Sequence, residues 1–370
     1  MMYLSIVIIA PLCGAASASP ETVNTPLVNA STTEGTSMNV PTYLDDRPVT
    51  ALRFNTHDHG IVLPFGRQPD KLDYLGARDM WVFEAEGMFH LFYDGNGPEG
   101  WRCCHATSRD LVDWEVHGAI LELGDPGRPD SAYAGYGATI FDGGLWHFFY
   151  VGCEQTTPPP ARVPAMPYIN CKAEAEHPGG PWRKRYDITP FAPKPGTYYA
   201  DTCNPGHIVK IDGEFIMFFS AAIFHEGGVK RTLGLARTRD LNETWQPDPE
   251  PMLPLEEQVE NAAVYYEEAN DLWYVFTNHV GFTDRGEFRD AVWAYWTDDI
   301  NYWDPANKAV VVDGQNCTWS RVSIGMAALG RVGSRLGVIY DAPGGDSVDN
   351  IGNSIGLAWL DLPLQPPVAK

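Results

Sequence analysis

The sequence lacks a long amphipathic helical stretch, and no segment after the first twenty residues is long and apolar enough to span a membrane. Basic residues are scarce: 26 Lys and Arg stand against 48 Asp and Glu, which gives a formal net charge of −22. A chain this acidic repels phosphate backbones and anionic lipid surfaces. We therefore expect neither a nucleic acid nor a membrane as a partner.

Aromatic residues and turn formers are abundant instead. The chain contains 12 Trp, 17 Tyr and 16 Phe together with 36 Gly and 30 Pro, and 44% of its residues are hydrophobic. Aromatic side chains are favoured in strands, whereas Gly and Pro end helices and mark turns. The composition predicts an all-β fold with a substantial core.

The N-terminal end is typical of an exported protein. MMYLSIVIIAPLCGAASASP combines an apolar run with small residues, which predicts a signal peptide over residues 1–19, although an ordinary N-terminal strand is the alternative. A linker-like segment over 20–50 and one folded domain over 51–370 follow, and we expect a secreted or periplasmic location. Six cysteines then remain, without a repeated metal-ligand pattern, and Cys153 and Cys171 are the simplest disulfide candidates.

One strand pattern occurs five times. Its copies are EGMFHLFYDG from Glu86, GGLWHFFYVG from Gly143, DGEFIMFFSA from Asp212, NDLWYVFTNH from Asn270 and GSRLGVIYDA from Gly333. Each is a turn followed by an aromatic-rich strand, and the period of about sixty residues suits a four-stranded blade. The repeat predicts a five-bladed β-propeller, whose first strands line a central channel.

A second repeat follows the first in three of the blades. ATSRDLVDWE from Ala106, ARTRDLNETWQ from Ala236 and YWTDDINYWDP from Tyr295 each carry an acidic residue, an apolar residue and then a Trp. Blade two keeps only Trp182, and blade five is degenerate. We expect these segments to form outer strands, with Trp114, Trp245 and Trp303 packed between neighbouring blades.

Three of the five expected inner strands carry an acid. They contain Asp79 in GARDMWVF, Asp201 in YADTCNPGHIV and Glu260 in VENAAVYY, and we expect the three to meet at the centre. Hydrolysis of a glycosidic bond needs one carboxyl group to protonate the leaving oxygen and a second to activate water or attack the anomeric carbon. Clustered acids also raise one another's pKa.

These segments resemble the family 43 glycoside hydrolases and their propeller relatives, which include arabinanases, xylosidases, invertases and levanases, over roughly Asp58 to Leu362. The resemblance implies that Asp79 is the general base, Asp201 the residue that adjusts pKa, and Glu260 the general acid. Asn204-Pro205 is an alternative match for the second acid. Invertase-like relatives use the first Asp as a nucleophile and retain configuration.

Several other residues are candidates for the centre. Neoagarobiose hydrolases resemble this chain and use His as the acid, which makes His207, His225 and His279 candidates. In the cluster formed by His57, Asp58 and His59, alternation along a strand predicts that one side chain faces the channel. The full set of expected substrate-binding residues is Arg78, Trp81, Tyr136, Asn204, His207, His279 and Arg321.

The sequence therefore predicts a secreted, exo-acting glycoside hydrolase with a carbohydrate substrate from plants or algae. No cofactor is expected to be required, and relatives sometimes hold a central structural calcium ion, near which His207 is a candidate. The loops 158–167 and 282–289 are expected to set specificity. The alternatives are a noncatalytic carbohydrate-binding propeller and a glycoside phosphorylase; the latter needs several basic residues in the channel, where Arg78 and Arg321 are the main candidates.

Overall fold

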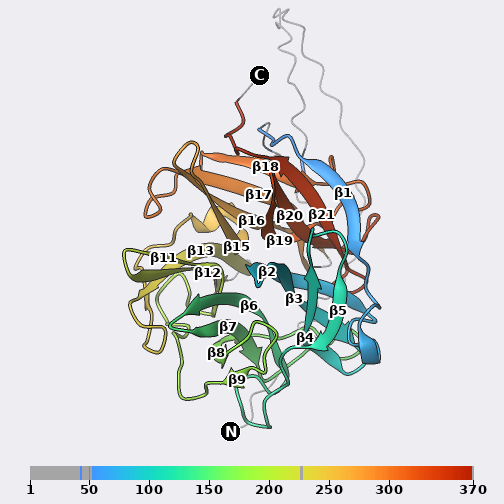
Figure 1. Cartoon of the computed structure of the whole chain (residues 1–370), viewed down its shortest axis with the longest axis vertical. Coiled ribbons are helices and arrows are strands. Elements are labelled where there is room, and N and C mark those ends of the chain that lie inside the picture. The colour runs from blue at the N-terminus through green and yellow to red at the C-terminus, as the bar shows by residue number, and fades with distance from the viewer. Residues whose placement is uncertain (1–41, 44–49, 51, 226–227, 285, 369–370) are drawn as a thin grey trace, which may run out of the picture. The chain divides into compact units, whose positions relative to one another are not determined.

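The computed structural model describes residues 42–43, 50, 52–225, 228–284 and 286–368. These residues form five antiparallel sheets arranged around a central axis, which confirms the predicted all-β, five-bladed propeller (Figure 1). The predicted signal peptide over 1–19 lies outside the described residues, as does nearly all of the 20–50 segment. In the described part of the chain, no helix has the length and apolar character needed to cross a bilayer.

Each blade runs from an inner strand to an outer one. Blade 1 contains β2 (Gly76–Ala85), β3 (Met88–Gly97), β4 (Gly100–Ser108) and β5 (Glu115–Ala119). Blade 2 contains β6 (Tyr133–Asp142), β7 (Leu145–Cys153), β8 (Ile169–Ala175) and β9 (Arg183–Lys184). Blade 3 contains β10 (Thr202–Asn204), β11 (Ile208–Ile211), β12 (Glu214–His225), β13 (Gly228–Thr238) and β14 (Gln246–Pro247).

The remaining two blades complete the ring. Blade 4 contains β15 (Val259–Glu267), β16 (Leu272–Thr283), β17 (Gly286–Thr297) and β18 (Lys308–Asp313). Blade 5 contains β19 (Gly325–Val332), β20 (Arg335–Ala342), β21 (Ser354–Asp361) and β1 (His57–Leu63). Two short 3₁₀ turns, η1 (Pro69–Lys71) and η2 (Leu255–Glu257), lie in the connections.

The five copies of the repeated pattern are the second strands of the blades, namely β3, β7, β12, β16 and β20. The predicted packing between blades is confirmed for Trp245 and Trp303. Trp245 of blade 3 contacts Phe149 of blade 2, and Trp303 of blade 4 contacts Phe218 of blade 3, in both cases edge to face. These rings join neighbouring sheets and so stabilise the circular arrangement.

Blade 5 is degenerate in sequence because its outer strand comes from the other end of the domain. β1 pairs with β21, so the segment that holds His57, Asp58 and His59 is the outermost strand of this blade. The prediction that one of these side chains faces the channel is therefore wrong. Asp58 has a different role: its Oδ1 accepts a hydrogen bond from Tyr340 Oη at 2.5 Å, and its Oδ2 accepts from the Thr318 amide at 2.6 Å.

We expect Asp58→Ala to lower the free energy of unfolding by about 1–3 kcal/mol, because it leaves the Tyr340 hydroxyl and the Thr318 amide without their acceptor. Urea denaturation of the full chain at neutral pH measures the change. Asp58→Asn keeps the shape and one acceptor oxygen and should lose less. An unfolding midpoint equal to that of the wild type would show that these hydrogen bonds do not stabilise the fold.

All six described cysteines are buried free thiols, so the predicted Cys153–Cys171 disulfide is wrong. Cys171 in β8 lies opposite Tyr150 in β7, three residues from Cys153. Three residues along a strand span about 10 Å, beyond the Cα separation of about 4.4–6.8 Å that a disulfide needs. Burial instead raises the pKa of the Cys171 thiol to about 12, which leaves it unreactive.

Candidate active site

The inner strand of each blade contains one shift or break in its pairing with the second strand. In blade 1 the pairing with β3 shifts between Arg78 and Met80, and Asp79 takes a φ of 48°. In blade 4 the pairing shifts after Glu260, and Asn261 takes a φ of 60°. Left-handed backbone at such residues costs on the order of 1–3 kcal/mol, and a bulge redirects the neighbouring side chains. Strain of this kind concentrates at functional sites.

The other three blades show the same interruption. The pairing of β6 shifts around Tyr136, that of β19 shifts after Gly325, and blade 3 has a gap between Asn204 and Ile208 that splits its inner strand into β10 and β11. A cavity of about 290 Å³ lies among these irregular segments. The charged and polar residues from the strands that line it include Arg78, Asp79, Asp94, Tyr136, Asn204, Arg231, Glu260, Glu287 and Arg289.

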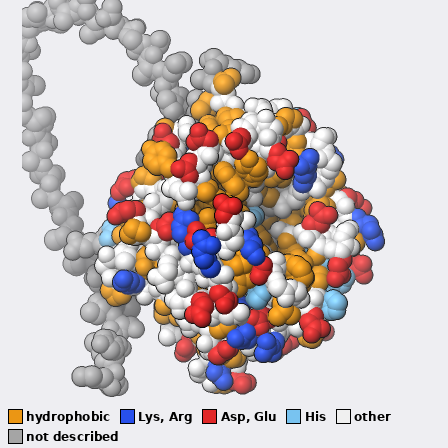
Figure 2. All heavy atoms as spheres, turned by 60° about the vertical axis from the view of Figure 1, so that its left-hand side comes forward, with side chains coloured by type: hydrophobic (Ala, Val, Ile, Leu, Met, Phe, Trp, Pro, Cys, Tyr) orange, Lys and Arg blue, Asp and Glu red, His pale blue; other side chains and the backbone are white. Residues whose placement is uncertain are grey.

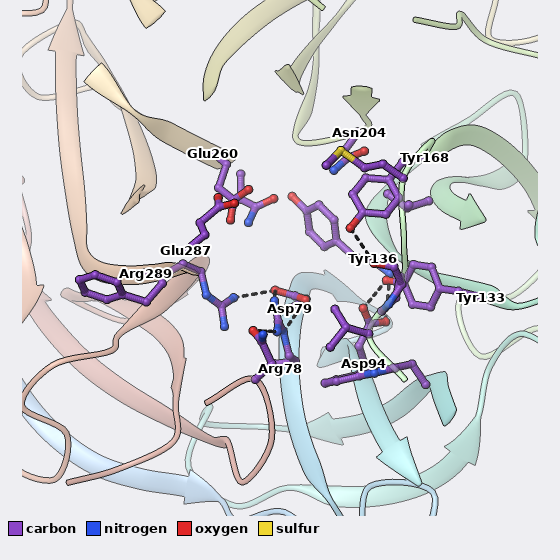
Figure 3. A pocket seen from close by; sticks show the side chains of 18 of the residues that line it. Arg78, Asp79, Asp94, Tyr133, Tyr136, Tyr168, Asn204, Glu260, Glu287 and Arg289 are labelled. Atoms are coloured by element: carbon purple, nitrogen blue, oxygen red, sulfur yellow. Dashed lines mark hydrogen bonds and ion pairs between the residues drawn. The ribbon is translucent and has the colours of Figure 1, made fainter. Parts of the chain in front are cut away.

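Asp79 is held by two arginines. Its Oδ2 accepts a hydrogen bond from Arg78 Nε at 2.7 Å, and its Oδ1 accepts from Arg289 Nη1 at 2.7 Å (Figure 3). Burial by itself raises the pKa of Asp79, but the charges and hydrogen bonds of the two guanidinium groups outweigh it and hold the pKa below its ordinary value. Asp79 is therefore an ionised carboxylate that can accept a proton.

Glu260 has a different set of partners on the other side of the cavity. Its Oε2 lies 2.8 Å from Arg231 Nη1, and its Oε1 accepts a hydrogen bond from Asn278 Nδ2 at 3.2 Å. Arg231 also pairs with Glu287, so one guanidinium group is shared by two carboxylates. The Glu260 side chain is 15% exposed and borders the cavity, where it can exchange a proton with a ligand.

A polar residue at one position of the repeated pattern supports these inner strands. The ninth residue of the pattern is Asp94 in blade 1 and Ser220 in blade 3. Asp94 Oδ1 accepts from the Tyr136 amide at 3.1 Å, and Ser220 Oγ accepts from the Asn261 amide at 2.7 Å. In both cases the second strand of one blade holds the irregular segment of the next, which fixes the cavity walls.

Asp94 adds a further carboxyl group next to Asp79. Burial raises the pKa of Asp94 well above its ordinary value, and the nearby charge of Asp79 raises it further. The Tyr133 hydroxyl donates a hydrogen bond to Oδ2 of Asp94. The cavity thus holds one carboxyl group with a raised pKa beside another with a lowered pKa, a division typical of acid–base sites.

Two residues that the sequence placed at the centre lie elsewhere. Asp201 does not line the axial cavity; it precedes β10, and its Oδ2 accepts a hydrogen bond from the Phe224 amide at 2.6 Å. Asn204, the alternative match for the second acid, lines the cavity together with Asp79 and Glu260. The prediction that Asp79, Asp201 and Glu260 meet is therefore wrong for Asp201. Arg321 forms an exposed ion pair with Asp346 at 2.7 Å and does not line the cavity.

Trp81, His207 and His279 also lie outside the cavity wall. Trp81 Nε1 donates to Thr139 Oγ1 at 3.0 Å, and its ring packs edge-on against His207, so these side chains fill the channel between inner strands. His279 stacks on Trp293 and its Nδ1 lies 3.1 Å from Asp290. It follows Asn278 in β16, and the alternation of side chains along a strand turns it away from the cavity.

His207 is held as a neutral ring. Its Nδ1 accepts a hydrogen bond from the Val264 amide at 3.0 Å, and burial lowers its pKa to about 4. The unfolded chain, with an ordinary His pKa of about 6.5, therefore binds more protons than the folded chain between these two values. The stability contributed by neutral His207 is complete above about pH 6.5 and declines as the pH falls toward 4.

We expect the fall in unfolding free energy between pH 7 and pH 4.5 to be smaller in His207→Asn than in the wild type, by roughly 2 kcal/mol. Asn keeps an acceptor for the Val264 amide and does not titrate. Urea denaturation at the two pH values measures the difference. His57→Asn, at an exposed histidine, is the matched control; an equal pH dependence in the two variants would contradict the assignment.

The described residues contain no group of three or more His, Cys, Asp or Glu side chains arranged to hold a metal ion. His207 Nδ1, at the position considered for a central calcium, already accepts a hydrogen bond. Figure 2 shows that, on the face it displays, Asp and Glu are scattered over the surface and do not form a single patch.

Sequence reasoning missed Asp94, Arg231, Glu287 and Arg289. Arg231 and Arg289 are only 8% and 7% exposed, and both come from third strands, β13 and β17, rather than from inner strands. Two signals could have located them: charged residues interrupt the apolar runs of these strands, and the ninth position of the repeat is polar in four of its five copies.

Solved structures with the same fold include glycoside hydrolases. One described as a glycoside hydrolase has a TM-score of 0.65 and 15% identity, over 86% of this chain and 96% of that one. A family 117 glycoside hydrolase from the marine bacterium Zobellia galactanivorans has a TM-score of 0.57 and 15% identity over the same shares. The resemblance to five-bladed propellers of this group is confirmed at the level of the fold.

Comparison by sequence gives a shorter match. A 1,2-beta-oligomannan phosphorylase from Thermoanaerobacter sp. (strain X514) is 31% identical over 61 residues, which are 16% of this chain and 20% of that protein. The matched region thus spans about a fifth of the length of this curated relative. No protein-family model matches the chain.

Proposed function

We propose that the protein is an exported glycoside hydrolase that removes sugar units from the end of a plant or algal oligosaccharide or polysaccharide. The observation that carries the proposal is the pair Asp79 and Glu260, which come from the inner strands of blades 1 and 4 and border one cavity with different partners. Glycoside hydrolysis requires two such carboxyl groups with separate roles.

In the proposed mechanism, Glu260 donates a proton to the glycosidic oxygen, and Asp79 acts as base toward water or as nucleophile at the anomeric carbon. The lowered pKa of Asp79 suits either role, because it keeps the carboxylate ionised. After bond cleavage, Glu260 carries the negative charge until it regains a proton.

Neutral groups around the carboxylates suit a sugar ligand. Tyr136 lines the cavity, and its hydroxyl is a group with which a sugar hydroxyl can form a hydrogen bond. Asn204 and Tyr168 border the same space (Figure 3). The volume of about 290 Å³ lies just below the usual range for ligand pockets, about 300–1,000 Å³, which suits a small ligand such as a single sugar unit.

A glycoside phosphorylase is the second candidate, because three arginines, Arg78, Arg231 and Arg289, border the cavity. Guanidinium groups bind phosphate well, and the partial match to an oligomannan phosphorylase points in the same direction. Each of these arginines is already paired with a carboxylate, however, so phosphate would have to compete with Asp79, Glu260 or Glu287. This competition favours hydrolysis.

The test is release of reducing sugar by the wild type from arabinan, xylan, fructan, red-algal and β-1,2-linked manno-oligosaccharides, with and without inorganic phosphate. We expect turnover that does not depend on phosphate, and none by the double variant with Asp79→Asn and Glu260→Gln. Turnover that requires phosphate and yields a sugar phosphate would identify a phosphorylase. Binding of a glycan without any turnover would identify a noncatalytic carbohydrate-binding propeller.

A further inference from the structure

A second cavity adjoins the axial one. It is lined by the loop residues Pro164 to Tyr168 together with Asp201 and Phe224. Pro164, Met166 and Tyr168 line both cavities, so the two cavities are neighbours. Tyr168 Oη donates to the carbonyl of Pro164 at 3.0 Å, which holds this part of the loop in one shape. A ligand in the axial cavity therefore lies next to the second one.

The second cavity combines an aromatic face with a fixed carboxylate. Phe224 is 54% exposed near the end of β12, so its ring is accessible to a ligand in the cavity that it lines. Two hydrogen bonds hold Asp201 beside Phe224. The Asp201 amide donates to the Ala222 carbonyl at 3.1 Å, and Asp201 Oδ2 accepts from the Phe224 amide at 2.6 Å. Oδ1 of Asp201 accepts no hydrogen bond from the described residues, so it is available to a ligand hydroxyl.

We propose that this second cavity is a subsite for a further, uncharged sugar unit of the chain whose reacting unit occupies the axial cavity. The proposal rests on the proposed function. An exposed ring packs against the apolar face of a sugar, while a carboxylate oxygen accepts from its hydroxyls. Asp201 is the one charged residue among those that line the subsite, and it disfavours a uronic acid or a sulfated unit.

The experiment measures binding by calorimetry in full-length Glu260→Gln, in which turnover is expected to be too slow to consume the ligand during the titration. The probes are arabinose, xylose, fructose and neoagarobiose and their longer oligomers. We expect affinity to rise with chain length in the parent. Phe224→Ala is expected to remove that gain, on the order of tenfold, without changing the affinity for the shortest ligand. Asp201→Asn should weaken binding of the longer chains less.

Phe141→Ala is the matched control, because Phe141 is 53% exposed and lies at the other end of an inner strand from Tyr136. It should leave the chain-length gain intact. A parent without such a gain, or a gain that survives Phe224→Ala, would overturn the subsite. Failure of the hydrolase proposal appears separately, as absence of turnover by the wild type on the same sugars.

Discussion

Glu260→Gln is expected to lower kcat/KM for an unactivated oligosaccharide by about 10²–10⁴-fold, the usual contribution of a general acid. Gln keeps the length of the side chain and one acceptor oxygen, which suffices for Arg231 Nη1, 2.8 Å from Oε2 of the carboxylate, but not also for Asn278 Nδ2, 3.2 Å from Oε1. The variant lacks the carboxyl proton that the wild type donates to the leaving-group oxygen. Initial rates of reducing-sugar release by the wild type and the variant measure the effect.

A leaving group that needs no proton separates acid catalysis from a loss of structure. With a nitrophenyl glycoside of the same sugar, Glu260→Gln should retain most of the wild-type rate of bond cleavage. Glu287→Gln is the matched variant, since Glu287 shares Arg231 with Glu260 and borders the same cavity. If Glu287→Gln shows this pattern and Glu260→Gln does not, Glu287 is the acid.

The propeller could be predicted because its core requires the same residues five times. The aromatic strands β3, β7, β12, β16 and β20 pack between neighbouring sheets, so each copy is under the same physical constraint. Asp79 and Glu260 could be located for a related reason. Each lies on the inner strand of its blade, shortly before the repeated strand, where the inner strand faces the axis.

Asp201 could not be placed in the same way, because the inner strand of blade 3 is interrupted. β10 ends at Asn204 and β11 begins at Ile208, and an interruption of this kind changes which side chains face the axis. Counting back along the sequence from the repeated strand of blade 3 leads to Asp201, but the sequence does not reveal the break between β10 and β11. In the structure, Asn204 lines the axial cavity and Asp201 lines the second cavity beside it.

The arginines were missed for a different reason. Arg231 lies in β13 and Arg289 in β17, and each is far in sequence from its partner at the centre. Arg289 pairs with both Asp79 and Asp341, so its burial depends on carboxylates from two other blades. Contacts between residues so far apart in the chain follow from the assembled ring and not from the local pattern of any strand.

Asp79→Asn is expected to lower kcat by about 10²–10⁴-fold on both nitrophenyl glycosides and unactivated oligosaccharides. A good leaving group does not replace the group that activates water or attacks the sugar, so no rescue of the kind expected for Glu260→Gln should occur. Since Arg78 and Arg289 lower the pKa of Asp79, the wild-type activity should persist to a pH below the ordinary range of a carboxyl group. Rates across pH for the wild type and Asp79→Asn measure both effects.

A structural role for Asp79 predicts a different result. If the carboxylate served only to neutralise Arg78 and Arg289, its loss would reduce the unfolding free energy and KM would rise with kcat largely kept. Asp341→Asn is the matched control, because it also removes a carboxylate from Arg289 but lies outside the cavity wall. Restoration of Asp79→Ala turnover by azide, a small anion able to attack the sugar, with no such effect in Asp341→Ala, would assign Asp79 to the reacting atoms.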